Sequence, residues 1–562
     1  MRIIPQVKKY EEGTGIADLT YLNWSFCDGL DGRVIAAAKR FFPNTSGGVR
    51  VRIDSGSGMS EGYTLDITND GVYIRSGGPA GAFYAIMTLR QLLRDSRRIR
   101  CCSITDEPSM EYRGFYHDVS RGKIPNMDTL KALVDRMAEL KLNSLQLYIE
   151  HTFEFREYEF CRDDLGCLTA EEIRELSEYC TDNFIDLVPS VSLFGHLYHL
   201  LQSDRYSHLS ELQDYKPTSH YWVERMRHHT INPLDEESFD VVKNLIDQYL
   251  GVSDSIWFNI CCDETFDLGR GVNAGQDRDR LYIDFVKRIT EYLTRKRRRV
   301  MMWSDFTWDD PDKIGELPEN SVLLSWDYEA EPNEEHISAI DAANRKQIVC
   351  PGTSSWSAFS ENIRVEEKNI TAMAQYGHLY SAIGMLNTNW GDYGNIGSLT
   401  MAQYGLLIGA AASWNRRTAV NSYFRKDASE LLYGNTELLD LMEDVSWNRG
   451  CSNWSRLISG EGETLERKYY EDAVSLCDKT AHRIGELKFN DPTVRREVLS
   501  AVDGYALLAK WCALRDGEEI PCYVDFDEWI DEYEKLWRMR NSRDELHEVL
   551  RVFRACNEGA AI

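Results

Sequence analysis

The stretch that decides the fold is Ile256-Trp-Phe-Asn-Ile-Cys-Cys-Asp-Glu264, an apolar run that ends in two adjacent carboxylates. A strand that is buried on both faces reads as a nearly continuous apolar run, and such strands are typical of parallel sheets covered by helices. Neighbouring side chains on a regular strand point to opposite faces. We therefore expect the chain to turn already at Asp263, so that both acids can serve one site.

The sequence around this strand repeats one order: a short apolar run, a polar tip and a helical segment. Helical spacing of apolar residues is present in Met127–Lys141, Thr169–Asp182, Glu236–Gly251 and Asp277–Arg297. Strands that alternate with such helices indicate βαβ units and a parallel sheet. The apolar runs are Tyr112–Val119, Asn143–Glu150, Asp186–His196, Ile256–Glu264, Arg299–Phe306, Val322–Tyr328, Gln347–Trp356 and Ile383–Trp390. These eight runs predict an α/β fold of the (β/α)8 TIM-barrel type, whereas the alternative, an open doubly wound sheet, gives no reason for the number eight.

Acids and tryptophans gather at the ends of these runs. The tips include Glu150-His151, His196, Asp263-Glu264, Trp303-Ser-Asp305, Trp326-Asp-Tyr328, Trp356 and Trp390-Gly-Asp392. One tryptophan near a strand end is usually part of the core, but four on successive tips of a closed ring would converge on one cavity. Aromatic walls with a few directional acids suit a pyranose ring, and a pair of acids at a strand tip suggests glycoside hydrolysis. An isolated Asp-Glu pair is more often a salt-bridged loop.

Two further regions flank the barrel region, which we place at residues 109–425. Residues 1–108 are predicted to form a small α+β domain, with strands at Val49–Ile53, Gly62–Ile67 and Gly71–Ser76 and a helix at Gly81–Leu93. Residues 426–562 are helical in pattern and strongly charged. The expected role of this C-terminal domain is packing or dimerisation, so a homodimer is a prediction.

Composition excludes several classes of partner. Acids outnumber bases 91 to 64 in the 562 residues, and the net charge of −27 disfavours nucleic acids and anionic membranes. No stretch approaches the roughly 18 apolar residues of a membrane span, and the amino terminus lacks the apolar run of a signal peptide. The 14 cysteines are scattered, often inside apolar runs, and none forms a CxxC pair. We therefore expect reduced thiols and a cytoplasmic protein.

With these residues in view, the chain resembles the family 20 glycoside hydrolases, the β-N-acetylhexosaminidases. Five motifs match in order: Arg113-Gly-Phe-Tyr-His-Asp-Val-Ser-Arg121, Met137–Leu145, Phe194-Gly-His196, Asn259-Ile-Cys-Cys-Asp-Glu264 and Trp390-Gly-Asp392. The family has His-x-Gly-Gly-Asp-Glu at the fourth motif and Trp-x-Glu at the fifth. Here Asn259 replaces the histidine, Cys261 and Cys262 replace the glycines, and Asp392 replaces the glutamate.

The resemblance implies a retaining enzyme that releases an N-acetylhexosamine, GlcNAc or GalNAc, from an oligosaccharide or glycoconjugate without a metal or other cofactor. Acids and tryptophans that close the eight strand tips predict a pocket for a single terminal sugar, and hence exo action. In this mechanism the acetamido oxygen of the substrate attacks the anomeric carbon and gives an oxazolinium intermediate. Glu264 is then the acid and base, and Asp263 orients the acetamido group. A tyrosine hydroxyl would donate to the acetamido oxygen, with Tyr328 as the first candidate and Tyr393 as the second.

The same resemblance suggests how the sugar ring would be held. Arg113 is expected to donate to the hydroxyls at C3 and C4, Asp392 to accept from those at C4 and C6, and His196 to hydrogen-bond an active-site carboxylate. The tryptophans expected to wall the sugar are Trp303, Trp326, Trp356 and Trp390.

Two other functions are compatible with parts of the sequence. A metal-dependent barrel hydrolase would use His117, Asp118, His151, His196 and Asp263 as ligands, but none has the close paired spacing of a dedicated site such as His-x-His. A non-catalytic carbohydrate-binding barrel is suggested by Asn259 and the paired cysteines. The intact Asp263-Glu264 pair argues against it, because a binding module needs no acid.

Overall fold

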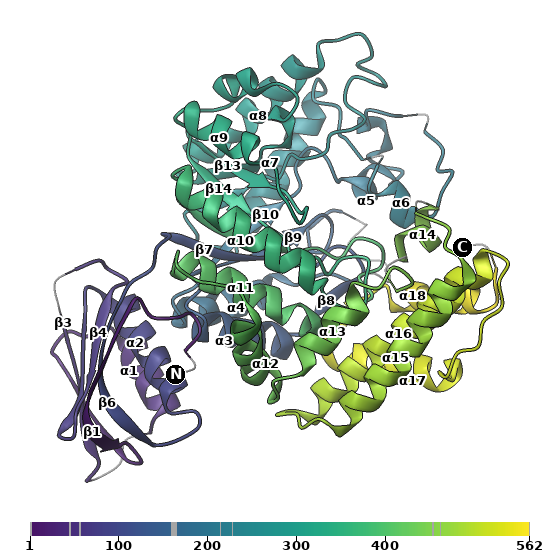
Figure 1. Cartoon of the computed structure of the whole chain (residues 1–562). Helices are drawn as coiled ribbons and strands as arrows, with labels where there is room; N and C mark the ends of the chain where they lie inside the picture. Colours follow the sequence, from purple (N-terminus) through teal and green to yellow (C-terminus); the bar gives the residue numbers. More distant parts are fainter. Residues whose placement is uncertain are drawn as a thin grey trace.

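The computed structural model describes residues 3–43, 47–55, 58–158, 166–213, 215–227, 229–451, 454–460 and 462–560. Along the chain these residues form a mixed-sheet domain, a closed barrel and a set of helices that packs beside the barrel (Figure 1). Among the described helices, none combines the length and the apolar composition needed to cross a membrane.

The N-terminal domain is a six-stranded sheet with two helices on one face (Figure 1). The strand order is β1-β6-β4-β5-β3-β2, and β4 and β5 pair antiparallel. The elements are β1 (Lys9–Asp18), β2 (Leu22–Phe26), α1 (Gly32–Phe41), β3 (Val49–Ser55), β4 (Tyr63–Ile67), β5 (Gly71–Ser76), α2 (Pro79–Leu92) and β6 (Arg98–Asp106). Residues of β4 alternate between buried and half-buried, as expected for a sheet with one covered face. The predicted α+β domain is confirmed.

The centre of the molecule is a closed barrel of eight parallel strands. Its strands are β7 (Tyr112–Asp118), β9 (Ser144–Ile149), β10 (Asp186–Val191), β11 (Trp257–Asn259), β12 (Arg299–Trp303), β13 (Ser321–Trp326), β14 (Gln347–Cys350) and β15 (Gly384–Asn389). Each strand lies within one of the eight predicted apolar runs or begins one residue before it, so the barrel prediction is confirmed and the open sheet is excluded. Every residue of β7 and β9 is buried, which explains their continuous apolar character.

Helices surround the barrel, and all of the longer ones except α11 begin at a side-chain cap. The longer ones are α3 (Met127–Glu139), α4 (Ala170–Asp182), α7 (Glu236–Leu250), α8 (Arg278–Arg295), α9 (Glu334–Ala342), α10 (Ile363–Leu379) and α11 (Gln403–Trp414). Short helices, α5 (Tyr198–Leu201) and α6 (Tyr221–Glu224), lie in the long connection after β10. Thr169 and Glu172 form a capping box at α4, which satisfies two backbone N–H groups that the helix leaves without partners.

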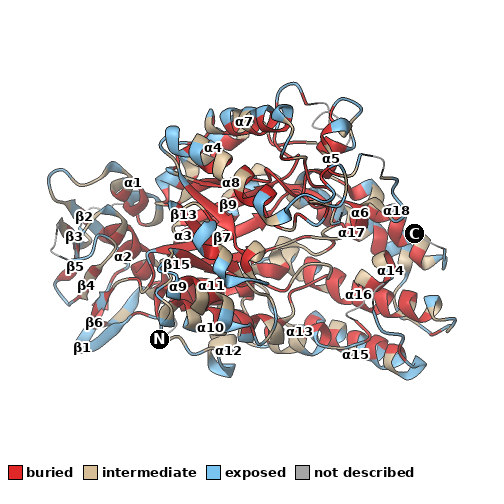
Figure 2. Cartoon of the chain, turned by 90° about the horizontal axis from the view of Figure 1, so that it is seen from above, coloured by how far each residue is buried: buried red, intermediate tan, exposed pale blue. Residues whose placement is uncertain are grey.

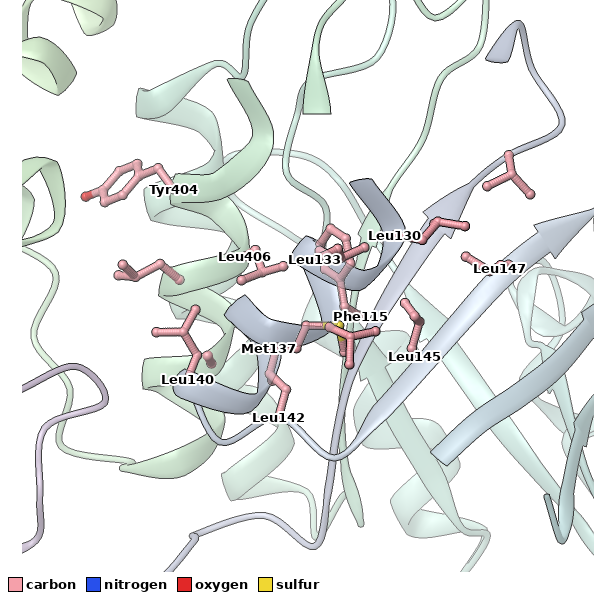
Figure 3. Packing of buried hydrophobic residues seen from close by; sticks show 14 of the residues in the cluster. Phe115, Leu130, Leu133, Met137, Leu140, Leu142, Leu145, Leu147, Tyr404 and Leu406 are labelled. Carbon is pink, nitrogen blue, oxygen red and sulfur yellow. The ribbon is translucent and has the colours of Figure 1, made fainter. Parts of the chain in front are cut away.

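Two apolar clusters hold the barrel together. Outside the strands, residues of β7, β9, α3 and α11 interdigitate (Figure 3), among them Phe115, Leu133, Met137, Leu145 and Leu406. Inside the barrel a second cluster includes Tyr116, Tyr148, Met301, Trp303 and Leu324, so the barrel is filled rather than open. In Figure 2 the barrel strands are accordingly buried, whereas the outer face of α7 carries exposed residues.

The C-terminal region is helical apart from one strand. Its elements are α12 (Ser422–Tyr433), α13 (Leu438–Ser446), α14 (Trp454–Ser459), α15 (Arg467–Glu486), α16 (Pro492–Arg515), α17 (Phe526–Arg540), β16 (Asn541–Asp544) and α18 (Leu546–Asn557). Strand β16 pairs antiparallel with β8 (Lys123–Pro125), which directly follows the first barrel strand. This two-stranded sheet was not predicted. That the helical region pairs two copies of the chain stays a prediction.

Candidate active site

The backbone after β11 turns in a way that brings both acids to one side. Cys261, Cys262 and Glu264 have φ values of 56°, 64° and 48°, in the left-handed region that L-residues rarely adopt. The side-chain oxygen of Asn259 accepts a hydrogen bond from the Cys261 N–H (3.0 Å) and so caps the end of the strand. The expected turn is therefore present, but it begins two residues before Asp263. A left-handed conformation strains a residue other than glycine by about 1–3 kcal/mol. Such residues persist mainly at functional sites, where the surrounding structure holds them in place.

One histidine lies between the two acids. The Nε2 atom of His196 is 3.3 Å from an oxygen of Asp263 and 3.3 Å from an oxygen of Glu264. Burial alone would lower the pKa of His196, but the negative charge of Asp263 and the close contacts of the imidazole with both acids outweigh burial and raise the pKa to about 10. The imidazole is therefore a cation at neutral pH. The Asp263 side chain is 11% exposed and the Glu264 side chain 28%, so Glu264 is the more accessible acid.

A second layer of charge stands behind this histidine. Arg121 lies 3.3 Å from the carboxylate of Glu150 and 3.4 Å from the Nδ1 atom of His196. Burial raises the pKa of Glu150, while the positive charge of Arg121 opposes that rise. The hydroxyl of Tyr148 donates to the same carboxylate (3.0 Å). Arg121 and His196 thus lie between the carboxylate of Glu150 on one side and those of Asp263 and Glu264 on the other.

A further carboxyl group, that of Asp305, binds the backbone of Glu264, the candidate general acid. Asp305 follows β12, and its carboxylate accepts a hydrogen bond from the N–H of Glu264 (2.9 Å). Burial and the nearby negative charges of Asp263 and Glu264 raise the pKa of Asp305 to about 7. The sequence places Asp305 at a strand tip, but no role was predicted for it. The signal available in the sequence was its position two residues after Trp303.

The sugar-binding role predicted for Arg113 is wrong. Arg113 is the second residue of β7, at the amino end of the strand, and its guanidinium is completely buried. It forms two hydrogen bonds of 2.8 Å with Glu61 of the N-terminal domain and donates to the Tyr84 hydroxyl and the Met110 carbonyl. Barrel active sites lie at the carboxyl ends of the strands, so Arg113 ties two domains together at the opposite end.

Arg121 stands at the end of the barrel where Arg113 was expected. It follows β7 by three residues and lies 3.5 Å from Asp118, 3.3 Å from Glu150 and 3.6 Å from Asp392. Its guanidinium also lies over the rings of Tyr148 and Trp390, at 5.0 and 5.1 Å from their centroids. Arg121 closes the sequence motif that begins at Arg113, but no role was predicted for it.

Asp392 and the tryptophan of the eighth strand complete the rim of the site. Asp392 has a φ of 48°, and burial raises its pKa to about 6 although the charge of Arg121 opposes this rise. The ring of Trp390 lies 5.9 Å from that of Trp303, and its indole N–H donates to the Tyr328 hydroxyl (2.7 Å). These residues come from four different strand ends and meet in one place.

An aromatic wall continues from this point along neighbouring strand ends. Trp326 stacks on Tyr328 (5.0 Å between centroids), and Tyr328 contacts Trp356 (5.2 Å). Trp308, which was not predicted, extends the wall through its contact with Trp326 (4.3 Å). Tyr393 differs, because its side chain packs against the main hydrophobic cluster. Tyr328 is therefore the better placed of the two tyrosines, and its bond to the acetamido oxygen stays a prediction.

The five ligands of the metal-dependent alternative do not assemble. His117 forms a hydrogen bond with Asn389 (2.8 Å), and the ring of His151 contacts that of His199 (4.0 Å between centroids), so neither joins His196. Among the described residues, one group has the composition of a metal site, namely His196, Asp263 and Glu264, whose ligand atoms lie within 4.8 Å of one another. A metal ion bound to His196 would add positive charge beside the guanidinium of Arg121, which lies 3.4 Å from the Nδ1 atom of this histidine. This neighbour disfavours a metal ion at the three residues.

The fold and the site define a (β/α)8 barrel with a carboxylate pair at its catalytic end. Residues 110–418 match the family model described as glycosyl hydrolase family 20, catalytic domain, and residues 36–107 match domain 2 of the same family. The catalytic match alone covers more than half of the chain, and the chain belongs to glycosyl hydrolase family 20.

Individual relatives are more distant. The chain is 34% identical over 160 residues to the β-hexosaminidase of Akkermansia muciniphila, which covers 24% of this chain and 32% of that protein. The matches span about a third of the length of the first curated relatives. The chitobiase of Flavobacterium johnsoniae has a TM-score of 0.63 at 14% identity, with 96% of this chain and 99% of that chain covered. An exo-β-N-acetylglucosaminidase of Vibrio harveyi in complex with N-acetylglucosamine gives a TM-score of 0.62 at 16% identity and covers 77% of this chain and 76% of that chain. These two structures show the shared fold.

Proposed function

We propose that the chain is an exo-acting, retaining β-N-acetylhexosaminidase that releases terminal GlcNAc or GalNAc from an oligosaccharide or glycoconjugate. The observation that carries this proposal is the placement of Asp263 and Glu264 on one side of the turn after β11, both 3.3 Å from the His196 cation. The names of the relatives, β-hexosaminidase and exo-β-N-acetylglucosaminidase, support the same activity.

Glu264 is the residue we assign to proton transfer. Its side chain is the more exposed of the pair, and its backbone is fixed by Asp305 and by a left-handed φ of 48°. It donates a proton to the glycosidic oxygen as the bond from that oxygen to the anomeric carbon breaks. When water later attacks the anomeric carbon of the oxazolinium, the bond from that carbon to the acetamido oxygen breaks, the acetamido group is regenerated, and Glu264 takes the proton from that water. The acid is thereby restored and the configuration at the anomeric carbon is retained.

Asp263 is the residue we assign to the acetamido group. Its carboxylate lies 3.3 Å from His196 and can accept the acetamido N–H and balance the positive charge that develops on the oxazolinium. The hydroxyl of Tyr328 would donate to the acetamido oxygen before that oxygen attacks. Because the nucleophile belongs to the substrate, the main contribution of the protein to the reaction rate is to hold the acetamido oxygen in position to attack the anomeric carbon.

Arg121 and Asp392 are the residues we assign to the hydroxyl groups at the far side of the sugar. Arg121 replaces Arg113 in this role, because it lies at the carboxyl end of β7, 3.6 Å from Asp392. The indoles of Trp303, Trp326 and Trp390 would line the apolar faces of the acetamide and the ring. Trp356 stays a candidate through its contact with Tyr328.

The first experiment compares hydrolysis of the 4-nitrophenyl β-glycosides of GlcNAc, GalNAc and glucose, with and without EDTA. We expect turnover of the two acetamido sugars alone, unchanged by chelation, and NMR should show the β-anomer as the first product. Equal turnover of the plain glucoside would contradict the participation of the acetamido group. Loss of activity in EDTA would support the metal-dependent alternative. Sugar binding without turnover would indicate a carbohydrate-binding barrel.

A cytoplasmic location stays a prediction.

A further inference from the structure

The segment that carries Asp392 is held from outside the barrel. Among residues Asp392 to Gly397, five of the six backbone carbonyls accept hydrogen bonds from side chains. The donors are Arg225, Trp454, Lys123, which donates to two of these carbonyls, and Tyr533. Two of these donors, Trp454 and Tyr533, belong to the C-terminal helical region. We infer that the C-terminal helical region contributes to the active site, because Glu545 and Trp454 hold Asp392 in the position in which it binds the sugar. The inference rests on the proposed function.

Glu545 acts on Asp392 through one intermediary. Its buried carboxylate pairs with Arg225 (2.9 Å) and accepts hydrogen bonds from the Trp222 indole and the Tyr221 hydroxyl (2.7 Å each). The other guanidinium nitrogen of Arg225 donates to the backbone carbonyl of Asp392 (2.9 Å). A residue near the end of the chain thus fixes the orientation of a cation that holds a residue of the sugar site. Helices α6 and α14 meet at this point (Figure 1).

Trp454 makes the second contact, and it is the simpler one to test. Its indole N–H donates to the carbonyl of Tyr393 (2.8 Å), the residue next to Asp392. Gly394, with a φ of 77°, lies against Trp222 so closely that a Cβ there would approach the ring within 2.6 Å. The loop is therefore clamped between α6 and α14. Without these contacts, the left-handed conformation of Asp392 would be one of several open to the loop.

The same C-terminal segment also touches the loop that carries Arg121. Strand β16 pairs with β8, two residues beyond Arg121, and the N–H of Glu545 donates to the carbonyl of Gly122 (2.8 Å). Arg121 and Asp392, the two groups we assign to the sugar hydroxyls, are therefore anchored by one neighbouring stretch. Glu545 and Trp454 are positioning residues, because neither contacts the reacting atoms.

The experiment compares two tryptophan substitutions in the full chain. Trp454→Phe removes the hydrogen bond to Tyr393 and keeps an aromatic ring. Trp529→Phe is the matched control, because Trp529 is also buried and its indole donates to a backbone carbonyl, that of Ser500 (2.9 Å), within the C-terminal region. With the GlcNAc glycoside, we expect Trp454→Phe to raise KM about 3- to 10-fold, the loss of one hydrogen bond, with little change in kcat. Trp529→Phe should leave KM unchanged.

A double-mutant cycle shows whether the effect passes through Asp392. In an Asp392→Ala background, Trp454→Phe should add nothing to the rise in KM, because the group that it positions is gone. Glu545→Gln should give a larger rise than Trp454→Phe, but it leaves Arg225 without its ionic partner and endangers folding. Tyr533→Phe, which removes the bond to Ile396, is the milder second variant, with an expected rise smaller than that of Trp454→Phe.

Hydrogen exchange of the peptide spanning residues 390–400 tests the inference without any turnover. We expect faster exchange in Trp454→Phe than in wild type and no change in Trp529→Phe. A wild-type protein inactive on acetamido glycosides would overturn the proposed function, whereas the exchange result would still decide whether the C-terminal region orders the loop. Any of three results would overturn the inference. The first is an equal rise in KM for both tryptophan variants, and the second is a rise in KM from Trp454→Phe that multiplies the rise caused by Asp392→Ala. The third is an unchanged rate of hydrogen exchange in Trp454→Phe.

Discussion

Arg113 and Arg121 stand eight positions apart in one sequence motif and do opposite things. Both guanidinium groups are almost completely buried, at 0% and 4% exposure. Arg113, at the amino end of β7, is saturated by Glu61, a tyrosine hydroxyl and backbone carbonyls. Arg121, beyond the carboxyl end, faces three carboxylates at 3.3–3.6 Å, and its Nε atom has no hydrogen-bond partner among the described residues. The two arginines lie at opposite ends of β7. This position, rather than membership of the motif, decides which arginine is structural and which is available to a ligand.

The largest effect is expected from removing the acid at the carboxyl end. Glu264→Gln should lower kcat about 10²- to 10⁴-fold on a glycoside with a poor leaving group, because the proton donor is lost. The thermal midpoint should stay close to that of wild type, since the side chain is partly exposed. Steady-state kinetics and a melting curve measure both. Near-normal turnover would remove Glu264 as the acid.

The two arginines can be compared by the same substitution. Arg121→Lys should lower kcat/KM about 10- to 100-fold, because a lysine cannot reproduce the fork of a guanidinium toward charged partners and sugar hydroxyls. Arg113→Lys should leave kcat/KM of the folded protein within about twofold, since no substrate reaches the amino end. Rates are normalised to the folded fraction. A larger kinetic loss for Arg113→Lys would reverse the assignment of the two residues.

The amino end should instead govern stability. Glu61→Gln removes the ionic partner of the buried Arg113 and should lower the free energy of unfolding by about 3–5 kcal/mol. Glu236→Gln is the control, because its pair with Arg288 lies on the surface, and the loss there should be about 1 kcal/mol or less. Urea denaturation gives both values. Similar losses in the two variants would mean that the Arg113 pair contributes no more than a surface pair.

The last comparison concerns the pH dependence of stability at the carboxyl end. The pKa of Asp305 is about 7 in the folded protein, above its ordinary value of 3.8, so the unfolded chain releases this proton first as the pH rises. The folded state therefore holds more protons between about pH 4 and 7, and the contribution of Asp305 to stability falls across this window. Asp305→Asn removes that fall, so the stability of the variant relative to wild type should rise from pH 4 to 7. A constant difference would show that Asp305 ionises normally.

Several features could be predicted from the sequence because they have local signatures. The eight barrel strands read as apolar runs, since strands such as β7 and β9 are buried on both faces, and each is followed by helical spacing. The turn that unites Asp263 and Glu264 follows from the alternation of side chains along a strand. Tryptophans at successive tips indicated a shared site, and Trp303 and Trp390 do come together.

Other features depend on contacts that no local pattern encodes. Separating Arg113 from Arg121 requires knowing where β7 begins and ends, which a motif does not state. Asp305 is one acid among many until the structure shows its bond to the Glu264 N–H. Glu545 and Arg225 are 320 positions apart in the chain, and charged residues surround both in the sequence, so nothing marked them as a pair.

The pairing of β16 with β8 has a consequence for the order of events during protein synthesis. The ribosome completes all eight barrel strands before it makes β16 and Glu545, the stretch that anchors the loops of Arg121 and Asp392. Phe359 of the barrel region packs against Tyr505, Trp529 and Phe553 of the C-terminal helices, so part of the barrel surface also stays uncovered until those helices are made. The loops of Arg121 and Asp392 therefore gain their anchors last, and a chain whose synthesis stops after the barrel lacks both these anchors and the helices that cover Phe359.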